Sequence, residues 1–131
     1  MIIETSALIA LALDEPEAPT FEQMLADAER LTMSAANYVE AFVVAENLGD
    51  AVLARQLDRL IGLYGIEIVP VDATQARAAS AAYRDYGRRS GHPAKLNFGD
   101  TFGYALAVTT GEPLLFKGDD FGETDVRRAL P

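Results

Sequence analysis

Residues 1–10 read MIIETSALIA, a short apolar run that ends in a carboxylate, Glu4, and continues with two hydroxyl residues. Apolar spacing then resumes, which is typical of a buried strand whose carboxyl end leads into a helix. In open α/β sheets, ligand sites lie just beyond the carboxyl ends of the strands, so Glu4 is a candidate functional residue. The alternative is that Glu4 only complements the dipole of a helix capped by Thr5 or Ser6.

Composition restricts the class of protein before any motif is used. The chain has 131 residues, half of them hydrophobic, which suits a single domain over residues 1–131 with a real core. No stretch reaches the roughly 18 apolar residues of a membrane span, and no signal peptide is recognisable, so we expect a cytoplasmic protein without a membrane contact. With no cysteine and a single histidine, His92, any metal would be a hard cation bound by oxygen.

The net charge of −9 argues against broad electrostatic attraction to nucleic acid, but the charge is unevenly distributed. Residues 1–60 hold three bases against eleven acids, a net of −8, and residues 61–131 hold eight bases against nine acids, a net of −1. Residues 77–95 hold five bases against one acid. This segment could offer phosphates a local basic rim, or it could be a solvated helix face.

The spacing of apolar residues predicts alternating strands and helices along the chain. The expected strands are residues 1–3, 31–33, 66–71 and 114–116, and the expected helices are residues 7–13, 20–30, 35–48, 50–63, 73–88 and 96–110. Ser34 and Asp72 are natural N-caps, and Pro16 is expected to open the second helix.

Further acids stand at strand ends or on inward helix positions of this pattern. Glu40 lies on or beside an apolar helix face, where glutamates are rare unless they are paired or bound to metal. Asp100 is the only charged residue of the apolar stretch 96–110, and Asp119 and Asp120 follow the last strand. The alternatives are a boundary glutamate whose head reaches water at position 40 and a helix cap at position 100.

Only a folded crevice could bring these acids together, because they are far apart in the sequence. Clustered carboxylates repel and raise one another's pKa. Such a cluster therefore makes physical sense mainly if it holds Mg²⁺ or Mn²⁺, which favour oxygen ligands.

Four motifs, in order, resemble the PIN-domain ribonucleases of the VapC toxin family. They are IIETSAL (2–8), SAANYVE (34–40), LNFGD (96–100) and LLFKGDDF (114–121), with TD (124–125) after the last. Each motif is weak alone, but the four occur in the family's order and spacing and span almost the whole chain. The first motif departs from the family, which normally has aspartate where this chain has Glu4.

The resemblance implies a three-layer α/β/α sandwich with a central, mainly parallel sheet. It also implies a Mg²⁺-dependent endoribonuclease that acts as the toxin of a type II toxin–antitoxin pair, with Mn²⁺ as a substitute cation. The catalytic and metal-binding residues would be Glu4, Glu40, Asp100 and Asp120, with Asp119 as a second candidate for the last position. The candidates for binding substrate phosphates are Ser6, Arg88, Arg89, Lys95 and Lys117.

The partners implied by the resemblance are an RNA substrate, a cognate VapB-like antitoxin and a second copy of the chain. DNA would be contacted only indirectly, through the antitoxin. The alternative is a PIN-like binding module that sequesters a basic partner. Its catalysis would be weakened or lost because Glu4 is one methylene longer than the usual aspartate and disturbs the metal geometry.

Overall fold

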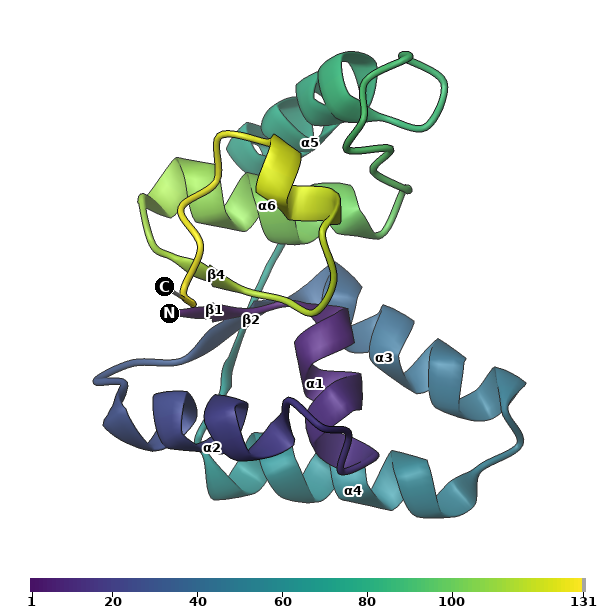
Figure 1. The fold of residues 1–131 in the computed structure, drawn as a ribbon, viewed down its shortest axis with the longest axis vertical. Helices are drawn as coiled ribbons and strands as arrows, with labels where there is room; N and C mark the ends of the chain where they lie inside the picture. The colour runs from purple at the N-terminus through teal and green to yellow at the C-terminus, as the bar shows by residue number, and fades with distance from the viewer. Residues whose placement is uncertain (131) are drawn as a thin grey trace.

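The structure is a computed structural model that describes residues 1–130, and its centre is one parallel sheet (Figure 1). The sheet has four strands within these residues, in the order β3-β2-β1-β4, and every pair is parallel. The strands are β1 (Ile2–Ile3), β2 (Thr32–Ser34), β3 (Glu67–Val69) and β4 (Leu114–Leu115). Ile2 lies opposite both Thr32 and Leu114, so the first strand is central.

Helices cover both faces of this sheet. The pair α5 and α6 lies on one face, and α1, α2, α3 and α4 lie on the other (Figure 1). Their bounds are α1 (Thr5–Ala12), α2 (Ala18–Asp27), α3 (Ala35–Asn47), α4 (Ala51–Leu63), α5 (Ala73–Tyr86) and α6 (Asp100–Thr110), and a 3₁₀ turn, η1 (Asp120–Glu123), follows β4. The expected three-layer α/β/α sandwich is confirmed. No described helix is long and apolar enough to cross a membrane.

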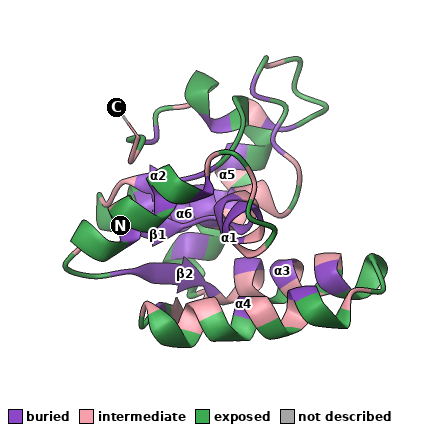
Figure 2. Ribbon diagram, turned by 60° about the horizontal axis from the view of Figure 1, so that its bottom comes forward, coloured by how far each residue is buried: buried purple, intermediate pink, exposed green. Residues whose placement is uncertain are grey.

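Two apolar cores form because successive side chains of a strand point to opposite faces. Ile3 and Leu115 face the core with α1 to α4, whereas Ile2 and Leu114 face the core with α5 and α6. Figure 2 shows β1 and β2 buried between helices that expose their outer surfaces. The largest fully buried side chains of the first core include Phe21, Leu8, Met33, Leu53 and Leu57, and those of the second include Leu96 and Leu106.

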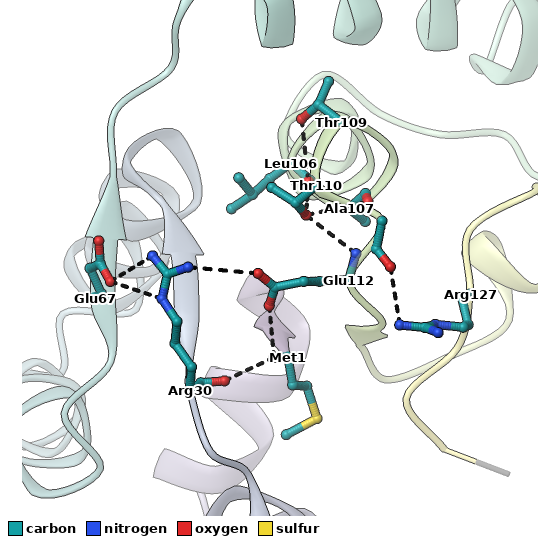
Figure 3. Close-up of polar contacts among 10 residues, drawn as sticks. Met1, Arg30, Glu67, Leu106, Ala107, Thr109, Thr110, Glu112 and Arg127 are labelled. Atoms are coloured by element: carbon teal, nitrogen blue, oxygen red, sulfur yellow. Dashed lines mark hydrogen bonds and ion pairs between the residues drawn. The ribbon is translucent and has the colours of Figure 1, made fainter.

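The amino ends of the strands are joined by a polar network (Figure 3). The amino group of Met1 donates to the Arg30 carbonyl at 2.8 Å and pairs with Glu112 at 2.9 Å. The Arg30 guanidinium pairs with Glu67 at 2.9 Å. The pair of Arg30 with Glu67 is largely exposed and contributes little to stability. The network as a whole connects the amino ends of the strands, at the end of the sheet opposite the carboxyl ends.

Three helix starts differ from the prediction by two residues or more. The first helix begins at Thr5 and not at residue 7, because Glu4 and not Thr5 or Ser6 is its N-cap. The second helix begins at Ala18, with Pro19 in its first turn, so the prediction that Pro16 opens it is wrong. The last helix begins at Asp100 and not at residue 96, because Leu96 pairs with the backbone of Tyr86 and Arg88. Asn97 and Asp100 then bond each other reciprocally, backbone N–H to side-chain oxygen, at 2.8 and 2.9 Å.

Candidate active site

A pocket of about 320 Å³ lies beyond the carboxyl ends of β1 and β4. Its wall contains the carboxylates of Glu4, Glu40, Asp100 and Asp120, which come from four separate segments. The remaining lining residues are Thr5, Ser6, Ile9, Val44, Asn97, Lys117 and Phe121. The structure therefore brings together the four acids that the sequence singled out.

Glu4 is the N-cap of α1 and is only 2% exposed. Its Oε2 accepts from the backbone N–H of Ser6 at 2.7 Å and from the Ser6 hydroxyl. The Ser6 oxygen in turn accepts from the backbone N–H of Lys117 at 2.9 Å, which ties the end of β1 to the end of β4. Ser6 therefore holds a carboxylate in the pocket wall, and Glu4 both caps the helix and lines the pocket.

Burial raises the pKa of Glu4 to about 7, against the opposing effect of the Ser6 hydrogen bonds, and the charges of Asp100 and Glu40 raise it further. Burial likewise raises the pKa of Asp100 to about 6. The Asn97 N–H lowers the pKa of Asp100, the charges of Asp120 and Glu40 raise it, and Arg88 lowers it. The four carboxylates are therefore close enough to act on one another electrostatically.

Glu40 is placed against the backbone that leads into α6. Its Oε1 accepts from the Asn37 amide at 3.4 Å, and the same amide donates to the Gly99 carbonyl at 2.9 Å. A Cβ atom on Gly99 would lie 1.6 Å from the Glu40 Oε2. The glycine of the LNFGD motif thus leaves room for the carboxylate of another helix. The sequence reasoning missed Asn37, although it lies three residues before Glu40 and therefore on the same helix face.

Only one of the two acids after β4 reaches the pocket. Both acids are exposed, but Asp120 lines the pocket, whereas Asp119 precedes η1 and is absent from the lining. The geometry thus favours Asp120 as the fourth acid, and its role remains a prediction.

The candidate phosphate-binding residues are distributed around the pocket. Lys117 lines it, but its ammonium group pairs with Glu15 and Glu17, the latter at 3.3 Å. Arg88 is exposed and close enough to lower the pKa of Asp100. Arg89 and Lys95 are exposed on the loop between α5 and α6 and do not line the pocket.

The donor set fits a hard divalent cation, because four carboxylates offer oxygen ligands and the neighbouring acids raise the pKa of Glu4 and of Asp100 in the absence of a compensating charge. The side chains are not arranged to hold an ion as they stand: within residues 1–130, no three Asp, Glu or His side chains form such a group. Glu4 is directed to Ser6 and Glu40 to the backbone of Gly99. Coordination would therefore require these side chains to rotate.

The fold and the acidic pocket together define a class of protein. Residues 1–127 match the model of the PIN domain. The chain belongs to the PIN-domain family, and within that family it groups with the VapC ribonucleases.

Ribonuclease VapC42 of Mycobacterium tuberculosis is 51% identical over 129 residues, which cover 98% of each chain. Ribonuclease VapC28 of the same organism is 51% identical over 130 residues, which cover 99% of this chain and 98% of the relative. Among solved structures, the M. tuberculosis toxin VapC20, described as cleaving the sarcin–ricin loop, superposes with a TM-score of 0.74 at 15% identity over 95% of both chains. A chain of a toxin–antitoxin complex from Klebsiella pneumoniae has a TM-score of 0.65 at 20% identity and covers 92% of this chain and 88% of its own length. These two structures share the fold.

Proposed function

We propose that this protein is a metal-dependent endoribonuclease and the toxin of a toxin–antitoxin pair. The observation that carries the proposal is the pocket in which four carboxylates from distant segments meet, in a chain about half identical to VapC ribonucleases. The chemistry needs no cysteine or histidine, since carboxylates and a hard cation suffice for phosphodiester hydrolysis.

Glu4 and Asp100 would hold Mg²⁺, or Mn²⁺ in its place, with Glu40 and Asp120 supporting it directly or through water. When bound, the cation orients and activates a water and stabilises charge on the phosphoryl oxygens. The chain's own residues position the ligands: Ser6 holds the Glu4 carboxylate, and the Asn97 N–H holds the Asp100 carboxylate at 2.8 Å.

RNA phosphates on either side of the scissile bond would contact the basic residues near the pocket, with Arg88 and Lys117 closest and Arg89 and Lys95 further out on the loop. Lys117 would have to break its ion pairs with Glu15 and Glu17 before its ammonium group could bind an RNA phosphate.

Changing Asp100 to Asn tests the function. The variant should lose Mg²⁺ affinity and RNA cleavage, while its free energy of unfolding stays the same or rises, because a half-buried carboxylate with a raised pKa is replaced by a neutral group. Asp58→Asn on the exposed face of α4 is the matched control and should leave cleavage unchanged. Cleavage by Asp100→Asn at the wild-type rate and at matched Mg²⁺ would refute the role of Asp100.

The partners proposed for this function are a VapB-like antitoxin and a second copy of the chain, with DNA bound only through the antitoxin. The acidic pocket and α4, which exposes Val52 and Leu63, suit a small protein with an apolar helix and basic residues. Native mass spectrometry with and without the product of the neighbouring gene checks this, and a strict monomer in both samples contradicts it.

A binding module without catalysis is the second candidate. It is favoured by the orientation of the Glu4 carboxylate toward Ser6 and by the lack of a preformed three-ligand group within residues 1–130. Purified protein separates the two candidates: metal-dependent cleavage of RNA supports the enzyme, and binding of a basic partner without any cleavage supports the module.

A further inference from the structure

Asn37 is buried in the first turn of α3, and its side chain and backbone carbonyl together contact the segments that carry three of the pocket carboxylates. Its amide nitrogen donates to the carbonyl of Gly99, the residue before Asp100, and to the Glu40 carboxylate. Its backbone carbonyl accepts from the hydroxyl of Thr5, the residue after Glu4, at 3.3 Å. Asn37 is therefore hydrogen-bonded to Glu40 and to the residues adjacent to Glu4 and Asp100.

The amide of Asn37 also fills the space between α3, α6 and the stem of Glu4. A Cβ atom on Gly103 of α6 would lie 3.1 Å from the Glu4 Cγ and 3.2 Å from the Asn37 Oδ1. A side chain at position 103 would thus press on both residues. Asn37 and Glu4 therefore both lie close to the backbone of α6 at Gly103.

The amide oxygen of Asn37 is buried without a hydrogen-bond partner in the described part of the chain, which lowers the stability of the fold. Asn37 is 0% exposed, and its Oδ1 has no hydrogen-bond partner among residues 1–130. A buried polar atom without a partner is destabilising, whereas an apolar residue of similar shape avoids that cost. The presence of an amide here is therefore better explained by the two bonds of its nitrogen than by packing.

We propose that Asn37 is a positioning residue whose side-chain amide sets the spacing of Glu40 and Asp100 by joining α3 to the start of α6. The inference rests on the proposed function, because the spacing matters only if the carboxylates share a cation. Productive metal sites are held within about 0.5 Å, and removal of a residue that orients the ligands costs about tenfold to a hundredfold in metal affinity.

Gln75 provides a matched control for a purely structural role. It is also a buried amide, 6% exposed, whose nitrogen donates to one backbone carbonyl, that of Pro70, at 3.1 Å. Its Oε1 likewise has no partner within residues 1–130. Gln75 lies on α5 and does not line the acidic pocket.

The experiment compares Asn37→Leu with Gln75→Met, each an apolar residue of similar size. Mg²⁺ affinity is measured by calorimetry, RNA cleavage by initial rates, and stability by urea unfolding. Asn37→Leu should weaken Mg²⁺ binding by about tenfold or more and lower kcat, whereas Gln75→Met should retain both, whatever it does to stability. Wild-type Mg²⁺ affinity in Asn37→Leu, or an equal loss in the two variants, overturns the proposal.

The wild-type protein gives an independent readout if Asn37→Leu does not fold. During a Mg²⁺ titration followed by NMR, the side-chain amide signals of Asn37 should shift and saturate, and those of Gln75 should not; unshifted Asn37 signals overturn the proposal. A wild-type protein that neither binds Mg²⁺ nor cleaves RNA overturns the proposed function and this inference with it. An active wild type beside an equally active Asn37→Leu overturns this inference alone.

Discussion

Replacing Glu4 by glutamine is expected to stabilise the protein above neutral pH and to leave its stability unchanged in acid. Glu4 is almost fully buried, and its pKa is raised from 4.5 to about 7, chiefly by that burial. At about 1.4 kcal/mol per pH unit, the difference corresponds to about 3 kcal/mol. Glutamine has nearly the shape of the protonated acid and can still accept from Ser6, so Glu4→Gln avoids the cost of the buried charge.

The sign follows from where the proton is bound. Between pH 4.5 and 7 the folded protein keeps the proton on Glu4, whereas the unfolded chain has lost it. The free energy of unfolding of the wild type therefore falls as the pH rises through this window, relative to that of Glu4→Gln. Below pH 4.5 both states are protonated and the variant has no advantage; above pH 7 the full difference of about 3 kcal/mol applies.

Urea unfolding followed by circular dichroism, at pH 4 and pH 8 with EDTA present, measures the effect. Glu22→Gln on the exposed face of α2 is the control and should change stability little at either pH. Saturating Mg²⁺ at pH 8 should narrow the gap, since a cation stabilises the ionised wild type. Equal effects of Glu4→Gln at both pH values, or no gain at pH 8, would refute the argument that burial penalises the charge.

Two further changes test the geometry of the pocket. Gly99→Ala should displace the Glu40 carboxylate, whose Oε2 would lie 1.6 Å from the new Cβ, and should lower the rate of cleavage by about tenfold or more. Its free energy of unfolding should stay within about 1 kcal/mol of the wild-type value, because a helical φ of −63° accepts alanine. Gly62→Ala on α4, where a Cβ meets nothing within 4 Å, is the control, and equal cleavage by the two variants counts against the role of Glu40. Glu4→Asp should raise the initial rate of Mg²⁺-dependent cleavage by about tenfold or more and should reduce the preference for Mn²⁺ over Mg²⁺, since Mg²⁺ demands the stricter geometry. An unchanged or lower rate would mean that the pocket has adapted to glutamate.

Local sequence signals were sufficient for the order of the elements and for selecting acids that line the pocket, although they left Asp119 and Asp120 as alternatives. Ser34, Asp50 and Asp72 cap helices with their side chains, and caps of this kind are set by residues only a few positions apart. The acids could be identified because a carboxylate in an apolar stretch is rare.

The features that were missed depend on contacts between distant segments. The start of α6 at Asp100 is set by the pairing of Leu96 with the end of α5. The side-chain amide of Asn37 donates to the Gly99 carbonyl, which is 62 residues away in the sequence. The pairing of Lys117 with Glu15 similarly joins residues 102 positions apart. No periodicity within a helix or strand carries this information.

The pairing of the first strand with the last sets when during synthesis the nuclease can form. Ile2 and Ile3 are made before their partners on one side, which are Leu114 and Leu115. The same late segment supplies Asp120 and the Lys117 N–H that holds Ser6. Long-range pairing of this kind has to wait for the distant strand. A nascent chain that stops before β4 therefore has an incomplete sheet and an incomplete pocket.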